Sequence, residues 1–247
     1  MTTPLSKSFR LGLFLTGFIA LILILEVPLM AEDGGEPEAP TISILDFVRK
    51  GRAIGYVLIL LSFVSVGFAI EHALTISRGN LIPRGFLEEV NQLLDAKQYD
   101  EAAKRCENNR SFVAGIIAAG LSERGKGVMG YIDMQTAMQE AGEAQAGRFY
   151  RKIEVLSVVS RVAPMLGLLG TVTGMIRAFE TIARAESAPN PADLAIGISE
   201  ALVTTCMGLI VAIPTFCIVS FFRNKLDGLV SEAEATVEHM MSRFKKG

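Results

Sequence analysis

Three stretches of this chain contain no charged residue for close to the thickness of a bilayer. They run from Ala53 to Ile70, from Val162 to Ile176 and from Ala201 to Phe222. A membrane-spanning helix needs roughly 20 apolar residues, so the third stretch is long enough alone and the other two need flanking turns. The sequence therefore predicts an all-α membrane protein with three transmembrane helices, over residues 53–77, 153–183 and 196–222.

A fourth apolar run, Leu11 to Leu25, follows two basic residues and is succeeded by a small residue, Ala31. A basic start, a short apolar centre and a small residue at the cut are typical of a signal peptide. Residues 1–31 are therefore predicted to be a signal peptide, with an uncleaved anchor helix as the alternative. Residues 32–52 would form an external linker that ends in a short amphipathic helix.

Basic residues predict the orientation. Arg148, Arg151 and Lys152 precede the second predicted span, and Arg223 and Lys225 follow the third. Positive flanks stay in the cytoplasm. The same rule places the N-terminus outside the cytoplasm and the C-terminus in the cytoplasm.

This orientation assigns each remaining segment of the chain to one side of the membrane. Residues 78–152 become a cytoplasmic helical domain, 184–195 a short external loop and 223–247 a cytoplasmic C-terminal helix. One basic cluster, at 49–52, falls on the external side, where a preceding export signal would carry it. From Tyr131 the helical pattern continues without a breaker into the second span, which predicts a long helix that projects from the membrane.

Composition and spacing exclude several functions. A formal charge of -2 gives no polybasic surface for nucleic acid. His72 and His239 have no Cys or Asp at ligand spacing, so both are assigned to surface or interfacial roles and no metal is expected. The three cysteines form no metal motif and are expected to be structural. No catalytic constellation is visible, so the chain is predicted not to be an enzyme and to need no cofactor.

The second span carries small residues on one stripe. Gly167, Gly170, Thr171 and Gly174 fall at positions i, i+3, i+4 and i+7 of a helix. Small residues allow another helix to approach to backbone contact, so the glycines, with Pro164 before them, are predicted to form a packing face. Thr171 either bonds its own backbone or lines a polar path.

The third span begins with a polar strip. Glu200 stands at the edge of the uncharged run, and Thr204 lies one helical turn further along the same face. A carboxylate at mid-bilayer costs roughly 2.5–3.5 kcal/mol, which favours a functional role, although at the interface that cost nearly vanishes. Thr205 and Gly208 belong to an adjoining small-residue stripe, together with Ala201 and Ala212, and Pro214 is expected to kink or loosen the helix.

Two segments, APMLGLLGTVTGMIRAF and ISEALVTTCMGLIVAIPTF, resemble the signatures of the ExbB/TolQ/MotA family of ion-driven motor stator proteins, most closely its ExbB and TolQ branch. The resemblance is strongest over residues 161–222. It implies a homopentamer in the bacterial inner membrane around a single-span partner similar to ExbD or TolR. Thr171 and Thr205 match the pore-lining threonines of the family, and Glu200 matches its third-span glutamate.

The resemblance also implies a function. A membrane aspartate of the partner would take the ion, and the current would drive a TonB- or TolA-like protein in TonB-dependent transport or in outer-membrane maintenance. Protons are the favoured ion. Thr173 and Thr204 add hydroxyls to the family pattern, and extra oxygen ligands would suit Na+ as the alternative. A stand-alone channel and a structural scaffold are the less favoured interpretations.

Overall fold

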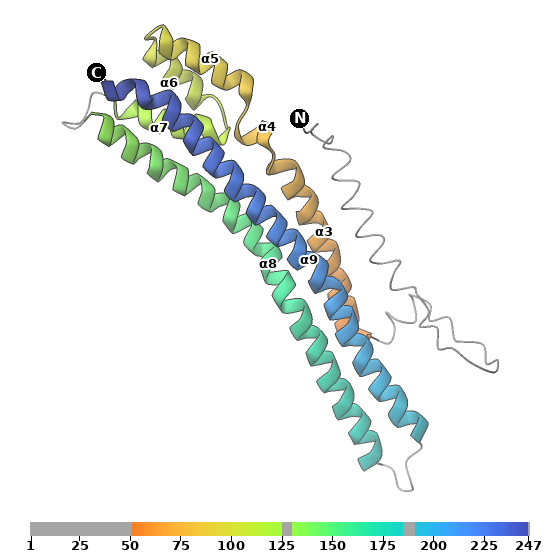
Figure 1. The fold of residues 1–247 in the computed structure, drawn as a ribbon. Helices are drawn as coiled ribbons and strands as arrows, with labels where there is room; N and C mark the ends of the chain where they lie inside the picture. Colours follow the sequence, from red (N-terminus) through yellow and green to blue (C-terminus); the bar gives the residue numbers. More distant parts are fainter. Residues whose placement is uncertain (1–50, 125–129, 185–190, 247) are drawn as a thin grey trace, which may run out of the picture. The chain divides into compact units, whose positions relative to one another are not determined.

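The computed structural model describes residues 51–124, 130–184 and 191–246, and all regular structure within these ranges is helical. The predicted signal peptide, nearly all of the external linker and much of the external loop lie outside the described residues. Three long helices dominate: α3 (Arg52–Thr75), α8 (Tyr131–Ala183) and α9 (Pro191–Met241). Figure 1 shows α8 and α9 side by side along most of their length, with α3 against them.

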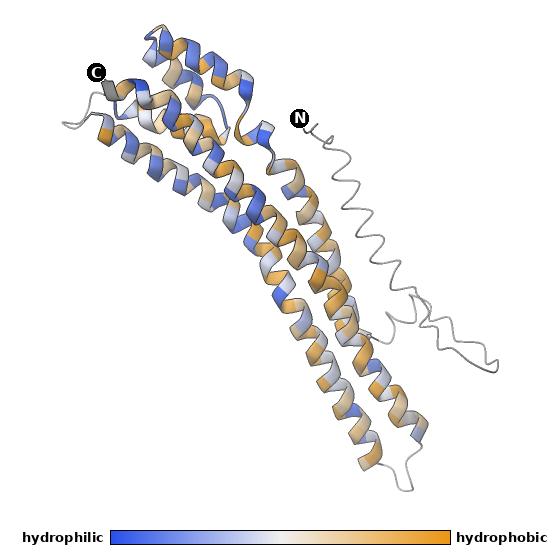
Figure 2. Cartoon of the chain, viewed as in Figure 1, coloured by the Kyte–Doolittle hydropathy of each residue, from blue (hydrophilic) through white to orange (hydrophobic). Residues whose placement is uncertain are grey.

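Each of these helices contains a segment long and apolar enough to cross a membrane, which confirms the prediction of three spans in an all-helical protein. At 1.5 Å per residue the 53 residues of α8 extend about 80 Å, far beyond a hydrocarbon core of about 30 Å. Figure 2 shows that α8 changes along the chain from mixed to mostly apolar, and α9 from mostly apolar to mixed. The long helices therefore continue out of the bilayer.

The remaining helices are short and gather at one end of the long helices, at the C-terminal end of α9 (Figure 1). They are α4 (Arg78–Leu81), α5 (Arg84–Asp95), α6 (Tyr99–Glu107), α7 (Phe112–Ser122) and the 3-10 helix η1 (Ser242–Lys246). Ser111 caps α7 by accepting a hydrogen bond from the backbone N–H of Ala114 at 3.4 Å. Most of α7 is buried against α6, α8 and α9, so this apolar helix forms the centre of this end of the described chain.

The environment of His72 differs from the one predicted from the sequence. The side chain is only 2% exposed and packs between the rings of Phe68 and Phe222, with centroid distances of 6.1 and 5.7 Å. Its Nε2 has no hydrogen-bond partner among the described residues. The surface or interfacial role predicted for this histidine is therefore wrong, because α9 covers the face of α3 on which it lies.

Cys106 is expected to resist alkylation in the folded protein. The side chain is 1% exposed, and burial raises the pKa of its thiol to about 12 from an ordinary 9.0. Because the thiolate is the nucleophile, this shift lowers its population on the order of a thousandfold at pH 8. Mass spectrometry after iodoacetamide treatment of a Cys206→Ser, Cys217→Ser double variant should find Cys106 modified only in denaturant. Equal modification rates in the folded and denatured protein would show that α6 does not bury this thiol.

Candidate functional site

Three glycines of α8 lie where α9 approaches most closely. A Cβ added to Gly167 would stand 3.0 Å from the Cα of Thr205, and one added to Gly170 would stand 2.2 Å from Oγ1 of Thr204. At Gly174 the added atom would be 2.7 Å from a side-chain carbon of α9. Real Cβ atoms essentially never come as close as at Gly170 and Gly174, and at Gly167 the backbone of α9 would have to shift by a few tenths of an ångström, so glycine gives α9 its room at these positions.

The facing surface of α9 is also made of small residues. A Cβ on Gly208 would lie 2.7 Å from the backbone oxygen of Ala163, and one on Gly197 would lie 3.0 Å from the Cβ of Ala178. Close backbone approach through small residues is how helices associate without a hydrophobic driving force inside lipid. We call this contact, between 163–178 of α8 and 197–208 of α9, the α8–α9 seam.

Both helices carry a proline near the seam. Pro164 lies within α8 and Pro214 within α9, and both helices are assigned as continuous through them. A proline lacks the N–H that would bond the carbonyl four residues earlier, at Ser160 and Ile210. Neighbouring helices and hydroxyl side chains make such gaps tolerable in a membrane.

Two threonines of α9 bond at the seam. Thr205 Oγ1 donates to the carbonyl oxygen of Gly167 at 3.0 Å, and this bond crosses between the helices. Thr204 is 5% exposed and donates to the carbonyl oxygen of Ala201 at 2.7 Å, with Gly167 O further away at 3.4 Å. A hydroxyl that has given its single hydrogen to a carbonyl still has lone pairs to offer a cation or another donor.

Two threonines of α8 near the seam, Thr171 and Thr173, occupy different surroundings. Thr171 Oγ1 donates to the carbonyl oxygen of Leu168 at 2.7 Å, and Thr173 Oγ1 donates to that of Leu169 at 3.0 Å. Both hydroxyls therefore bond their own helix, the simpler of the two roles considered for Thr171. Thr173, but not Thr171, lines a small hollow beside the seam.

This hollow has a volume of about 50 Å³, which is room for a water molecule or an ion that keeps part of its hydration. The first residues of α3 form one wall, and the seam forms the others. Its polar lining comes from Thr173 and Arg177 of α8 and from Glu200 and Thr204 of α9. The fold thus brings two predicted site residues, Glu200 and Thr204, together with two hydroxyl or charged groups of α8.

Opposite charges meet at this hollow. Glu200 is half-buried, and Arg177 is exposed at its edge. Arg177 was not among the predicted site residues, although Gly170, Thr173, Gly174 and Arg177 follow the i, i+3, i+4, i+7 pattern of one stripe. That spacing was the signal that could have identified it.

A second polar contact inside the apolar layer has no counterpart among the predicted residues. Ser65 of α3 and Thr215 of α9 are 4% and 2% exposed, and their hydroxyl oxygens are 2.8 Å apart. Thr215 donates its hydrogen to the carbonyl oxygen of Val211 at 2.7 Å, so Ser65 must be the donor to Thr215. This bond joins α3 to α9, which also carries Glu200.

Three helices long and apolar enough to span a membrane, packed through glycines beside a partly polar hollow, are typical of an integral-membrane protein. The model of the MotA/TolQ/ExbB proton channel family matches residues 96–235, and the chain belongs to this family. The match includes the seam, the hydroxyls and Glu200.

Relatives carry names from the same family. The chain is 29% identical over 198 residues to a biopolymer transport protein, ExbB-like 3, of Synechocystis sp., across 78% of this chain and 93% of the relative. It is 40% identical over 92 residues to the biopolymer transport protein ExbB of Pseudomonas putida, across 36% of this chain and 28% of the relative. The flagellar MotAB stator complex from Bacillus subtilis has the same fold at a TM-score of 0.56 and 20% identity, covering 92% of this chain and 88% of that chain.

Proposed function

We propose that this chain is the ExbB-like subunit of an ion-driven membrane motor and couples the proton motive force to TonB-dependent outer-membrane transport. The observation that carries the proposal is the hollow beside the α8–α9 seam, where Glu200 meets the hydroxyls of Thr173 and Thr204. A carboxylate among hydroxyls in apolar helices is costly unless it faces an ion, water or a partner.

In this proposal the chain supplies a polar wall. The hydrogens of Thr204 and Thr205 are already donated to carbonyls, so their lone pairs remain available to a cation. Glu200 adds a negative charge that offsets the positive charge of Arg177 at the same hollow and lowers the electrostatic cost of a cation there. One elementary charge crossing 100 mV releases about 2.3 kcal/mol, enough to bias a conformational step.

The ion acceptor is proposed to belong to a partner. By family resemblance this partner is an ExbD- or TolR-like single-span protein whose membrane aspartate takes the ion, and five copies of the present chain surround it. A broad apolar surface supports assembly in lipid, because large side chains on all three long helices are exposed in the single chain. The N-terminus would lie in the periplasm and the C-terminus in the cytoplasm of the inner membrane, as the basic flanks indicate.

Two alternatives stay within the family. A TolQ-like role in outer-membrane integrity uses the same chain architecture, but the ExbB names of the relatives favour transport. Sodium is the alternative ion, supported by the additional hydroxyls of Thr173 and Thr204. The family description as a proton channel favours protons.

The test is energy-dependent uptake of a large nutrient in cells that carry this gene and its neighbouring partner gene. A protonophore should stop uptake that requires this chain, while a sodium ionophore should leave it unchanged. The reverse pattern would identify Na+ as the driving ion. Insensitivity to both, with the chain still required, would contradict an ion-driven role.

A further inference from the structure

Arg177 shares the hollow beside the α8–α9 seam with Glu200, and its positive charge opposes the cation binding that Glu200 favours. Both residues line the hollow, whose volume is about 50 Å³. Arg177 is exposed, whereas Glu200 is half-buried. Within the part of the chain that the structure describes, the guanidinium of Arg177 forms no hydrogen bond or ion pair.

Two close contacts between the helices hold this arginine level with Glu200. A Cβ added to Gly174 of α8 would lie 2.7 Å from the Cβ of Ala201, the residue that follows Glu200 on α9. A Cβ added to Gly197, about one turn earlier on α9, would lie 3.0 Å from the Cβ of Ala178, the residue that follows the arginine on α8. The contacts flank the two charged residues on both sides, so the helices cannot slide to separate the charges.

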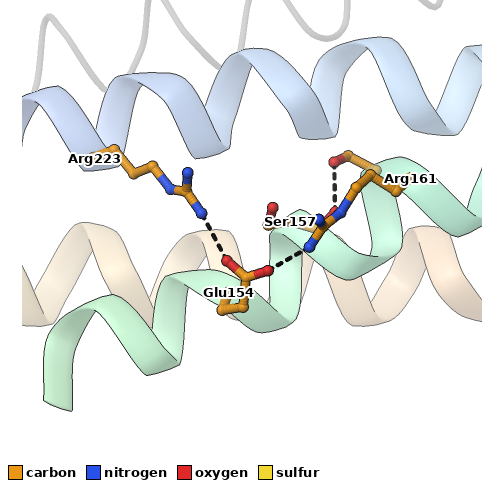
Figure 3. Close-up of polar contacts among 5 residues, drawn as sticks. Glu154, Ser157, Arg161 and Arg223 are labelled. Carbon is orange, nitrogen blue, oxygen red and sulfur yellow. Dashed lines mark hydrogen bonds and ion pairs between the residues drawn. The ribbon is translucent and has the colours of Figure 1, made fainter. Parts of the chain in front are cut away.

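Arginines are used differently at the other end of the uncharged run of α8 (Figure 3). There Arg223 of α9 donates from Nη2 to Oε2 of Glu154 at 2.7 Å, and Arg161 donates from Nη2 to Oε1 of the same carboxylate. These bonds depend on direction, for which the planar guanidinium is suited, and the bond of Arg223 joins α9 to α8. Arg177 makes no such bond among the described residues, so its effect on Glu200 comes from its charge.

A carboxylate and hydroxyl oxygens around a small hollow attract any cation that fits. The attraction between opposite charges grows as water is excluded, so an unopposed carboxylate would hold a metal ion for long times. An ion path has to release what it binds, because conduction requires sites that are weak enough to leave. Na+ also outnumbers H+ by several orders of magnitude at neutral pH. A positive charge beside the carboxylate therefore decides whether Na+ occupies the hollow.

We propose that Arg177 weakens the binding of Na+ in the hollow and so keeps Glu200 from being occupied by this ion. The inference rests on the proposed function, in which the hollow belongs to the path of the driving proton. With Arg177 present, Na+ leaves the hollow readily and does not compete with the proton. Without its charge, Na+ stays beside Glu200 and inhibits uptake. Arg177 is thus a specificity-determining residue, and it acts by repulsion.

Thermal unfolding of the full chain in detergent measures Na+ binding without relying on activity. NaCl is titrated against N-methyl-D-glucamine chloride at constant ionic strength, and an ion that binds the folded state raises the melting temperature. Arg177→Gln should raise the Na+ affinity about tenfold over the wild type. Arg177→Lys should behave as the wild type, because it keeps the charge. Adding Glu200→Gln to Arg177→Gln should remove the gain, which a purely structural role of the arginine does not predict.

Arg184→Gln is the matched control, since it removes the same charge from α8 about 10 Å further along the helix, where the side chain is 82% exposed. An equal gain in this control would show a general effect of surface charge and overturn the inference. Unchanged Na+ affinity in Arg177→Gln would overturn it as well. So would a gain found only in Arg52→Gln, at the first residue of α3, because the opposing charge would then belong to that helix.

Uptake in cells separates this inference from the proposed function. Uptake by Arg177→Gln should be inhibited by Na+ concentrations that leave the wild type unaffected. Uptake that a protonophore stops, combined with no response of Arg177→Gln to Na+, would overturn the role of Arg177 and leave the proposed function standing. Wild-type uptake that ignores the protonophore would contradict the proposed function, while the Na+ affinities in detergent would still decide whether Arg177 opposes cation binding.

Discussion

Glu200→Gln is expected to reduce ion-driven activity strongly while the protein still folds and assembles. The substitution keeps the size and hydrogen-bonding reach of the side chain, so the hollow beside Thr173 and Thr204 should keep its shape. It removes the negative charge that favours a cation there. A change of 1.4 kcal/mol in the energy of the ion at this step is tenfold in rate or occupancy, so we expect at least about a tenfold loss of uptake. The measurement is gradient-dependent uptake at matched protein levels.

Glu180→Gln provides the control for this substitution. Glu180 lies on α8 near the same end of the bundle, is exposed and pairs only loosely with Arg184 at 3.8 Å. An exposed pair of this kind contributes little to stability, so its loss should leave uptake close to the wild-type value. If Glu200→Gln retained full uptake at normal assembly, the hollow would have no role in ion transfer.

Gly170→Ala is expected to disrupt the α8–α9 seam despite adding a single methyl group. The new Cβ would stand 2.2 Å from Oγ1 and 2.5 Å from Cβ of Thr204. A rotamer change can move Oγ1 away, but Cβ is fixed to the backbone of α9, so the helices must separate. Overpacking of this kind costs about 1–3 kcal/mol, and Gly170→Val should cost more. Unfolding in detergent, followed by circular dichroism, measures the loss.

A compensating change makes this prediction specific. Thr204→Gly removes both clashing atoms, so Gly170→Ala should be less destabilising in that background than in the wild type. Gly67→Ala on α3 is the matched control, because an added Cβ there meets no atom within 4 Å. This control should be neutral or stabilising by up to about 1 kcal/mol, as expected for replacing glycine in a helix. Similar losses at Gly67 and Gly170 would contradict close packing at the seam.

The sequence by itself determined the membrane architecture. Lipid cannot satisfy backbone polar groups, so uncharged runs such as Ala201 to Phe222 have to be helices, and the structure has three helices long and apolar enough to span a membrane. The family was also recognisable from sequence, because its two signature segments are local. The glycines at 167, 170 and 174 were recognisable as small residues on one stripe, since helical periodicity alone fixes which positions share a face.

Only the tertiary structure decided what each face meets. Thr171 and Thr173 lie on opposite sides of the glycine stripe. Helical periodicity alone does not show which of the two sides another helix covers. The start of α3 closes the flank of Thr173, which places this threonine in the hollow with Glu200. The pairing of Ser65 with Thr215 and the burial of His72 likewise depend on α9 packing against α3. Such contacts join residues about 150 positions apart, and the rotation and register of one helix against another are set by the packing of both surfaces together.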